Sequence, residues 1–495
     1  MLSILGTKRT LCDGISRRDF LQVGGIGTLG LSLANSASLR ADAGGGTALG
    51  KAKSCILLFP YGSPSSHETF DPKPEMPDVQ GEMKAIATSV PGLHICDHLP
   101  KLAKVMDKVT VVRSMTHPYP VHGLAYAVTG IPTYTPELET RARDRRQWPF
   151  IGSVVDFLER RRWSKATSEI PRNIGLPWLV NSKSDNPAVN AGPFGAFLGA
   201  EYDPLWTDFD GPGLHIAPKS TVAQTKRFRN PFGGTTPNGR FHMSSGSELP
   251  ADISIERLRM RHSLLAQFDR DRRRLDRNPQ VQAWDNRQQL AMSLLTSNKM
   301  RNALDISREP RKVRERYGMN LFGQACLAAR RLIEAGGKFV TVFWDCFGQF
   351  ANGAWDTHQY HYPRMKELLL PGFDLAYPAL LNDLDERGML DETLVIWMSE
   401  HGRTPQINNK PGAGREHWSR AYSVALAGGG IARGKVVGQT TRDGGEVLDN
   451  PVSPKDILAT AYYLLGIDPH TTVPDREGRP HPIAGSGKLR KELLA

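Results

Sequence analysis

The chain has 495 residues, of which 39% are hydrophobic, and its 63 Lys and Arg against 51 Asp and Glu give a formal net charge of +12. This length and composition indicate two domains, or one large α/β domain with insertions, and exclude a mainly disordered chain. No apolar run reaches the roughly 18 residues that a membrane span needs, and no repeat of about 20–50 residues is present, which excludes a polytopic membrane protein and a solenoid.

The first 43 residues are predicted to be a twin-arginine export signal. Residues 16–21 (SRRDFL) match the twin-arginine pattern, a weakly apolar, glycine-rich stretch follows at 23–33, and Ala41-Asp42-Ala43 is an A-x-A cleavage site. We therefore expect the twin-arginine translocase as a partner during export. The mature chain is expected in the periplasm or the extracellular space, without a membrane span.

Five apolar runs predict buried strands, at residues 54–59, 109–112, 338–344, 393–398 and 421–427. Helices are predicted between them, at 99–106, 313–335 and 363–390, and a last helix begins at the capping box of Ser453 to Asp456 and ends at Gly466. Strands that alternate with helices predict a mostly parallel sheet with helices on both faces. Residues from about 131 to 335 break this pattern and are predicted to be an insertion, irregular at first and helical from 251.

Cysteine and charge patterns exclude several kinds of site. The four cysteines after the signal show no CxxC spacing, and two of them, Cys55 and Cys326, lie in apolar runs and are predicted to be buried thiols. The basic residues are concentrated between 257 and 316, and the run at 269–274 (DRDRRR) mixes charge signs and has no interleaved aromatics, which favours a solvated helix face over a nucleic-acid site. An anionic polymer or surface remains open as a partner.

Carboxylates and histidines gather where the predicted strands end, which is where open parallel sheets bind ligands. These residues are His67, Glu68 and Asp71 after the first strand; Arg113, Ser114, Thr116, His117 and His122 after the second; Asp345, Asp356 and His358 after the third; Glu400, His401 and Arg403 after the fourth; and Arg415, Glu416 and His417 just before the fifth. A single DxH motif or a single histidine is more often structural, but recurrence after successive strands favours a metal site. Imidazole with carboxylate suits Zn²⁺, and Mn²⁺, Ca²⁺ or Mg²⁺ would also accept such a set.

Several longer stretches resemble one known family, the exported bacterial proteins called domain of unknown function 1501, relatives of the alkaline phosphatases and sulfatases. They include GSPSSHETFDPKP (62–74), WDTH (355–358), LDERGMLDETLVIWMSEHGRTPQIN (384–408) and REHW (415–418). The resemblance covers nearly all of residues 50–485 and implies a single alkaline-phosphatase-like α/β sandwich with two divalent metals. Its pattern implies as metal ligands Glu68, Asp356, His358, Glu400, His401 and His417, although relatives mostly have Asp at the position of Glu68.

The resemblance does not supply an obvious nucleophile. The superfamily places Ser, Thr or a modified Cys at the start of a helix after the second strand, and residues 120–122 here contain neither Ser nor Thr. Ser114, Thr116 and His122 remain as candidates for attack or proton transfer. The C/S-x-P-x-R sulfatase signature is absent from the chain, which argues against a formylglycine mechanism.

Two functions follow from these residues. The first is an exported metal-dependent hydrolase of small or polymeric phosphate or sulfate esters, in which Arg113 and Arg403 stabilise the equatorial oxygens. The second is a non-catalytic binding or structural protein on the same fold, which holds an anionic glycan or an envelope partner. The insertion would contribute four tryptophans to that role, Trp148, Trp163, Trp178 and Trp206, although packing inside the insertion is favoured for them.

Overall fold

The computed structural model describes residues 49–119, 123–131, 136–139, 141–144, 146–162, 169–185, 187, 189–216, 228–244, 298–348 and 354–495. The predicted export signal, His122, Trp163 and most of the basic segment lie outside these residues. Among the described helices, none combines the length and apolar character needed to cross a bilayer.

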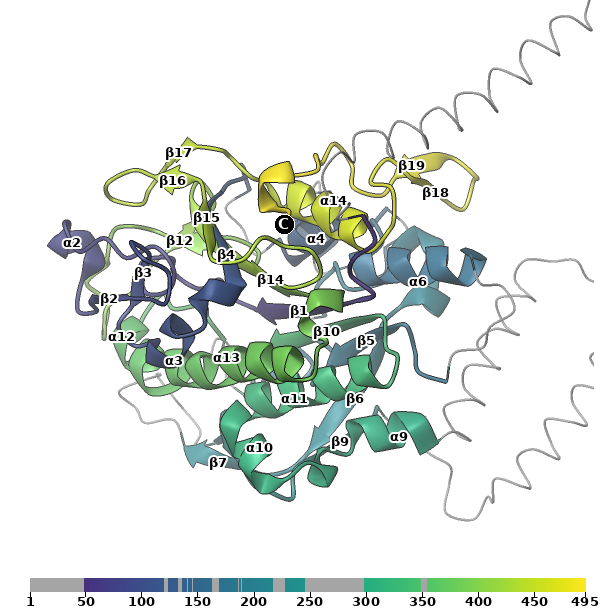
Figure 1. Ribbon diagram of the computed structural model, residues 1–495, viewed down its shortest axis with the longest axis horizontal. Coiled ribbons are helices and arrows are strands. Elements are labelled where there is room, and N and C mark those ends of the chain that lie inside the picture. Colours follow the sequence, from purple (N-terminus) through teal and green to yellow (C-terminus); the bar gives the residue numbers. More distant parts are fainter. Residues whose placement is uncertain are drawn as a thin grey trace, which may run out of the picture. The chain divides into compact units, whose positions relative to one another are not determined.

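A nine-stranded sheet forms the centre of the fold, in the order β15-β4-β14-β11-β1-β10-β5-β6-β9 (Figure 1). Its strands are β1 (Ser54–Pro60), β4 (Val109–Met115), β5 (Asn173–Leu176), β6 (Leu205–Asp210), β9 (Arg240–Met243), β10 (Phe339–Trp344), β11 (Thr393–Trp397), β14 (Tyr422–Ala427) and β15 (Lys435–Val437). Five neighbouring pairs are parallel, and three are antiparallel: β11 with β14, β14 with β4, and β6 with β9. The predicted mixed α/β fold with a mostly parallel sheet is therefore confirmed.

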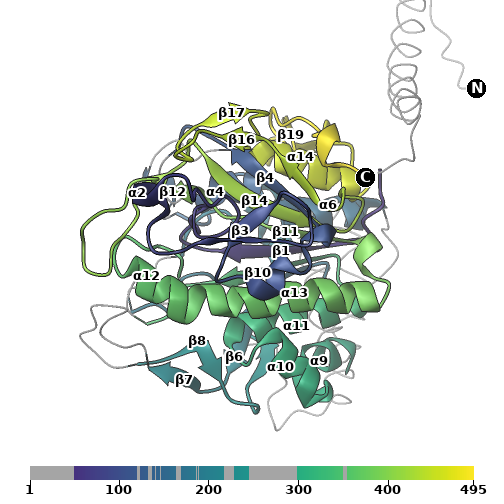
Figure 2. The ribbon, with the colours of Figure 1, turned by 60° about the vertical axis from the view of Figure 1, so that its left-hand side comes forward.

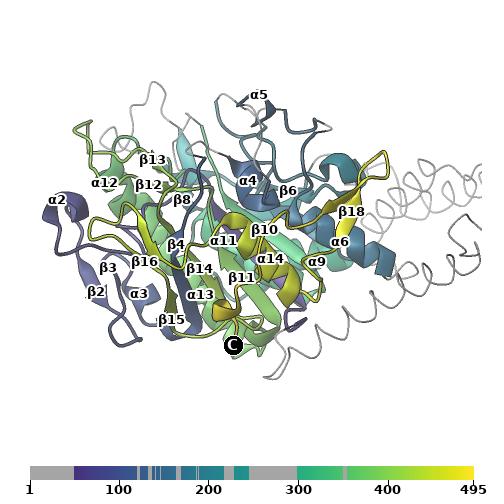
Figure 3. The same cartoon turned by 90° about the horizontal axis from the view of Figure 1, so that it is seen from above.

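Helices cover both faces of this sheet, as Figures 1 and 2 show. On one face lie α3 (Pro100–Ala103), α11 (Leu321–Glu334) and α13 (Leu370–Glu386); on the other lie α4 (Leu124–Thr129), α6 (Ile151–Arg162) and α14 (Pro454–Leu464), the last two also visible from above in Figure 3. Every residue of β1, β10 and β11 is buried, as expected for parallel strands between two helical layers. The four described cysteines are buried and form no disulfide with one another, which confirms the prediction for Cys55 and Cys326 as buried thiols.

Shorter elements connect these layers. The small sheets pair β2 (Ala85–Ala87) with β3 (His94–Cys96), β7 (Gly213–Ile216) with β8 (Arg229–Thr235), β12 (Gly402–Arg403) with β13 (His417–Trp418), β16 (Gln439–Thr440) with β17 (Val447–Asp449), and β18 (Thr472–Pro474) with β19 (Pro480–Pro482). The remaining helices are α2 (Pro77–Gln80), α5 (Pro136–Glu139), α9 (Asn298–Leu304), α10 (Arg311–Tyr317) and α12 (His361–Arg364).

The structure departs from the predicted elements in the middle of the chain. The range 131–335 was expected to be an irregular and helical insertion, but it contributes β5, β6 and β9 to the central sheet. These strands escape the sequence pattern because none of them is a continuous apolar run: β5 contains Asn and Gly, β6 contains two Asp, and β9 contains Arg and His. The helix predicted over 313–335 is broken at Gly318, whose φ of 92° ends α10 before Asn320 caps α11.

Candidate metal centre

Loops from four strands meet at one edge of the sheet. Since β1, β10 and β11 are parallel, their carboxyl ends share this edge. The neighbouring β14 runs antiparallel to β11, which places its amino end at the same edge. The short β13, which precedes β14, pairs with β12 so that His417 lies opposite Arg403. A histidine from before a strand therefore joins residues that follow other strands.

Asp356, His358 and His417 converge here, and we call them the Asp–His cluster. Their ligand atoms all lie within 4.8 Å of one another. Nε2 of His358 is 3.0 Å from Oδ1 of Asp356 and 3.0 Å from Nε2 of His417, and the His417 nitrogen is 3.4 Å from the same carboxylate oxygen. The aspartate is buried, whereas the two imidazoles keep 32% and 23% of their side-chain surface exposed, so the cluster is open to solvent on one side.

Glu416 orients His358 from behind the cluster, and the sequence analysis gave it no role. Its Oε2 contacts Nδ1 of His358. Its Oε1 accepts hydrogen bonds from Nζ of Lys410 at 2.8 Å and from Nδ2 of Asn408 at 2.9 Å. A carboxylate on Nδ1 keeps the proton there and leaves the Nε2 lone pair facing Asp356, as in carboxylate–histidine–metal arrangements. Its position next to His417 in the REHW stretch was the available signal.

Arg403 holds the loop after β1 against the cluster. Its fully buried guanidinium contacts Oδ1 of Asp356, and it donates to the main-chain oxygens of Gly62 and Ser63. Gly62 has a φ of 97°, and a Cβ added there would lie 2.4 Å from the main-chain nitrogen of Asp356. The close approach of these two loops thus requires glycine at this position.

Glu400 and His401 lie beside the cluster, outside the set of converging ligand atoms. The Glu400 carboxylate accepts hydrogen bonds from the main-chain nitrogen of Gly62 at 2.8 Å and from Oγ of Ser399 at 2.6 Å. The His401 ring lies 4.5 Å from the His417 ring, centroid to centroid, and its Nδ1 is 2.8 Å from the main-chain oxygen of Gly402.

Glu68 belongs to a separate, completely buried group. Its Oε1 pairs with Nη2 of Arg415 at 2.5 Å, and its Oε2 lies 3.1 Å from Nε2 of His361. Burial by itself would raise the pKa of Glu68, but Arg415, followed by His361, outweighs this and holds the pKa well below its usual range. Both carboxylate oxygens therefore already face protein groups. The sequence analysis missed His361, which lies three residues after the WDTH stretch.

The other predicted catalytic residues have contacts away from the cluster. Oγ of Ser114 donates to the main-chain oxygen of Asn450 at 2.6 Å, and Arg113 donates to the main-chain oxygens of Phe70 and His94. Thr116 is half-buried, and its main-chain nitrogen donates to Val452. His122 lies outside the described residues. The roles predicted for these four side chains stay predictions.

His117, from the same predicted group, touches the site through the main chain. Its Nε2 is 2.8 Å from the main-chain oxygen of Glu400. Burial lowers the pKa of His117 to about 4, so this imidazole is neutral at pH 7.

Asp345, at the carboxyl end of β10, is a buried acid to which the sequence analysis gave no role. It accepts hydrogen bonds from Nε1 of Trp178 at 3.0 Å and from the main-chain nitrogens of Asn181 and Cys346, each at 2.8 Å. Burial raises the pKa of Asp345 to about 7, although these hydrogen bonds favour the charged form.

The cluster suits a divalent cation. One carboxylate and two imidazoles are the donor set of many catalytic sites, in which three protein ligands leave a position for water or substrate. The fold and this set define the chain as a mixed α/β protein with a candidate Asp–His₂ metal centre at the edge of its sheet.

The chain belongs to the family DUF1501, described as a protein of unknown function, whose model matches residues 52–494. No curated protein matches the sequence.

Among solved structures, a sulfatase, PsFucS1 from Pseudoalteromonas sp., is similar at a TM-score of 0.37 and 12% identity, over 88% of this chain and 70% of that one. The lipoteichoic acid synthase LtaP from Listeria monocytogenes is similar at a TM-score of 0.35 and 10% identity, over 88% of this chain and 77% of that one. The phosphonate monoester hydrolase SpPMH from Silicibacter pomeroyi is similar at a TM-score of 0.31 and 9% identity, over 90% of this chain and 76% of that one.

Proposed function

We propose that this protein is a metal-dependent hydrolase of phosphate or sulfate esters. The observation that carries the proposal is the convergence of Asp356, His358 and His417 at a solvent-open edge of the sheet. Imidazole donors favour Zn²⁺, with Mn²⁺, Ca²⁺ and Mg²⁺ as alternatives. When bound, the ion would supply Lewis-acid polarisation of the ester anion.

The residues around the cluster would keep it in shape for this chemistry. Glu416 fixes the orientation of His358, and Arg403 holds Asp356. Glu400 and His401 are the proposed ligands of a second ion, because both lie against members or neighbours of the cluster. Glu68 is left out, since Arg415 and His361 already occupy its carboxylate.

The proposal includes export and an anionic substrate. The predicted signal in residues 1–43 supports action in the periplasm or the extracellular space on a small or polymeric anionic ester. His122, Ser114 and Thr116 stay the candidates for attack or proton transfer. Arg403 stays the candidate for charge stabilisation, whereas Arg113 is left out, because its guanidinium contacts Phe70, His94 and Asp71 away from the cluster.

A non-catalytic binding protein on the same fold is the second candidate. It is favoured by the charge balance around two of the predicted ligands, since Arg415 neutralises Glu68 and Arg403 contacts Asp356. An arginine can substitute for the charge of a metal without its reactivity.

Metal content separates the two candidates. We would measure it by elemental mass spectrometry on protein reconstituted with zinc, manganese, calcium or magnesium. The comparison is with a His358→Ala/His417→Ala variant and with His470→Ala, a control histidine whose side chain is 88% exposed. The hydrolase requires stoichiometric metal in the native protein and the control, and its loss in the double variant. Turnover of 4-nitrophenyl phosphate or 4-nitrophenyl sulfate should follow the metal.

A folded native protein that takes up none of these ions and hydrolyses neither ester would contradict the proposal. The non-catalytic binding protein would then be the better-supported function.

A further inference from the structure

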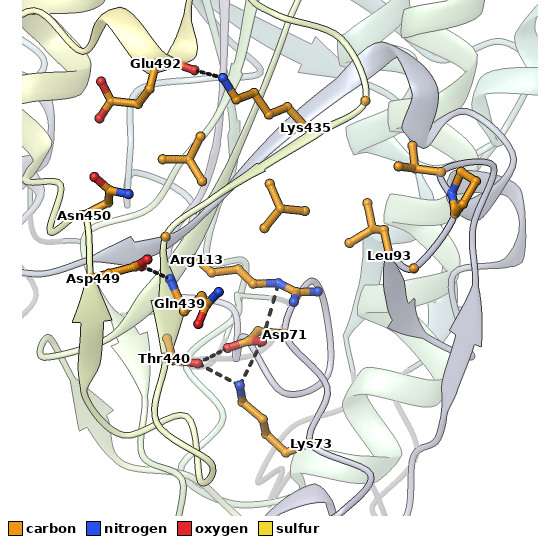
Figure 4. A pocket seen from close by; sticks show the side chains of 17 residues that line it. Asp71, Lys73, Leu93, Arg113, Lys435, Gln439, Thr440, Asp449, Asn450 and Glu492 are labelled. Carbon is orange, nitrogen blue, oxygen red and sulfur yellow. Dashed lines mark hydrogen bonds and ion pairs between the residues drawn. The ribbon is translucent and has the colours of Figure 1, made fainter.

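A pocket of about 710 Å³ lies apart from the Asp–His cluster, and no residue of the cluster lines it (Figure 4). It is formed by β15 and β16, the loop between β2 and β3, the end of β17, and Arg113 of β4. This volume is within the range of small-molecule sites.

The floor of the pocket is a network of ion pairs and hydrogen bonds around Asp71. Its Oδ1 lies 3.0 Å from Nζ of Lys73 and 3.4 Å from Nε of Arg113, and its Oδ2 accepts a hydrogen bond from Oγ1 of Thr440 at 2.5 Å. Nζ of Lys73 also donates to this threonine, at 2.7 Å. One carboxylate thus serves two cations, so these three side chains together carry one net positive charge. Asp449 brings a second carboxylate to the lining, and its Oδ1 accepts a hydrogen bond from the main-chain nitrogen of Gln439 at 2.6 Å.

Several polar groups face the pocket without using their hydrogen-bonding capacity. In the part of the chain that the structure describes, Nη1 of Arg113 and the side-chain amides of Gln439 and Asn450 have no hydrogen-bond partner. Lys435 donates to the main-chain oxygen of Glu492 at 2.7 Å and pairs with no described carboxylate. The Glu492 side chain itself pairs with Arg490.

Two elements contribute aliphatic side chains to the lining, which together we call the aliphatic wall. The loop between β2 and β3 contributes Val90, Pro91 and Leu93, and β15 contributes Val436, whose side chain is partly exposed. Amide groups that both donate and accept, next to an aliphatic wall, match the alternating hydroxyl and C–H surfaces of a sugar ring. The guanidinium and the ammonium match an acidic substituent on that ring.

We infer that this pocket binds one acidic sugar unit, a saccharide bearing a carboxylate or a sulfate ester, independently of the metal centre. Arg113 and Lys435 contact the acidic group, Gln439 and Asn450 contact the ring hydroxyls, and the aliphatic wall packs against the ring. The inference goes beyond the proposed hydrolase, because binding here requires neither metal nor turnover.

The test is calorimetric titration of the metal-stripped full chain with D-glucuronate, glucose 6-sulfate and glucose. Saturable binding of at least one acidic sugar, and weaker binding of glucose, is the expected result. The two acidic probes distinguish a carboxylate site from a sulfate site. Because metal is removed, failure of the hydrolase proposal would not affect this result.

Three variants locate the binding. Lys435→Ala should weaken the binding of the acidic sugar by about tenfold, because one charged contact is lost, and should change the binding of glucose little. Gln439→Ala should weaken the binding of both the acidic sugars and glucose. Both side chains are exposed, so the fold tolerates their loss. Lys104→Ala, an exposed lysine outside the pocket, removes the same charge as a control and should change nothing.

Two results would overturn the inference. One is the absence of saturable binding by either acidic sugar in the millimolar range. The other is binding that both pocket variants leave at the native affinity, which would place the ligand elsewhere on the chain.

Discussion

Replacement of Glu416 tests whether the Asp–His cluster is built for a metal. Removing such an outer carboxylate typically weakens metal affinity by about 10–100-fold. For Glu416→Ala we expect a loss of metal affinity at the lower end of this range, about tenfold, for two reasons. The Glu416 side chain is 45% exposed, so water can replace it, and Lys410 and Asn408 already share its charge.

Glu416→Gln should be worse than Glu416→Ala, although it is the more conservative change. Lys410 and Asn408 are both donors, so they require the oxygen of the new amide on their side. The NH₂ group of the new amide then faces Nδ1 of His358, and this nitrogen must accept a hydrogen bond from it. The imidazole proton moves to Nε2, the atom that points at the cluster, and blocks ligation there. We expect a loss nearer 100-fold.

The assay is calorimetric titration of metal-stripped protein with Zn²⁺, with thermal unfolding of the metal-free variants to verify the fold. Glu446→Gln serves as the control, because Glu446 is exposed and its ion pair among the described residues is with exposed Arg420. Native affinity in Glu416→Gln, or a larger loss in Glu416→Ala than in Glu416→Gln, would refute the tautomer argument.

Three further predictions concern stability. Arg415→Met should lower the free energy of unfolding in urea by about 3–5 kcal/mol, because it leaves the Glu68 carboxylate buried without its cation. Gly62→Ala should cost about 1–3 kcal/mol more than Gly336→Ala, because both have positive φ but only the first new Cβ meets another atom. Burial raises the pKa of Asp345 to about 7 in the folded state, whereas the unfolded state releases this proton near pH 4. Between these two pH values the folded state therefore binds more protons, and the free energy of unfolding should fall as the pH rises. Asp345→Asn should remove this fall, which thermal midpoints across the range would report.

Each of these predictions has a result that contradicts it. A double Glu68→Gln/Arg415→Met variant should regain part of the stability. No recovery would show that Arg415 acts mainly through the hydrogen bonds that it donates to the main-chain oxygens of Thr404, Pro405 and Val79. Equal losses at Gly62 and Gly336 would mean that the loops can separate at no cost. Parallel pH profiles of native protein and Asp345→Asn would show that this carboxyl titrates normally.

The sequence predicted the strands that lie between two helical layers. Residues 54–59 and 393–398 are continuous apolar runs, and they correspond to β1 and β11, which are buried throughout. It did not predict β6, because LWTDFD carries two aspartates and forms neither a continuous apolar run nor a regular alternation of apolar and polar residues. Its place in the sheet follows from pairing with β5 and β9, which no local pattern encodes.

The site was predictable as a list of residue types at one edge, but its grouping was not. Asp356, His358 and His417 were all candidates, and the register of β13 against β12 brings the last of them to the first two. Glu68 was a candidate of the same kind, yet a buried arginine takes it out of that group. Charge partners far apart in sequence decide such assignments, and spacing carries no information about them.

The arginines near the cluster show how its loops are held in place. Arg403 donates from Nε to Ser63, from Nη1 to the main-chain oxygen of Arg415, and from Nη2 to Gly62 and to Asp356. A guanidinium has five N–H donors, so most of this one is engaged with the protein. Its side chain is also completely buried. This geometry favours Arg403 as a residue that positions the Asp356 carboxylate, and it leaves the cluster's open side to the two imidazoles.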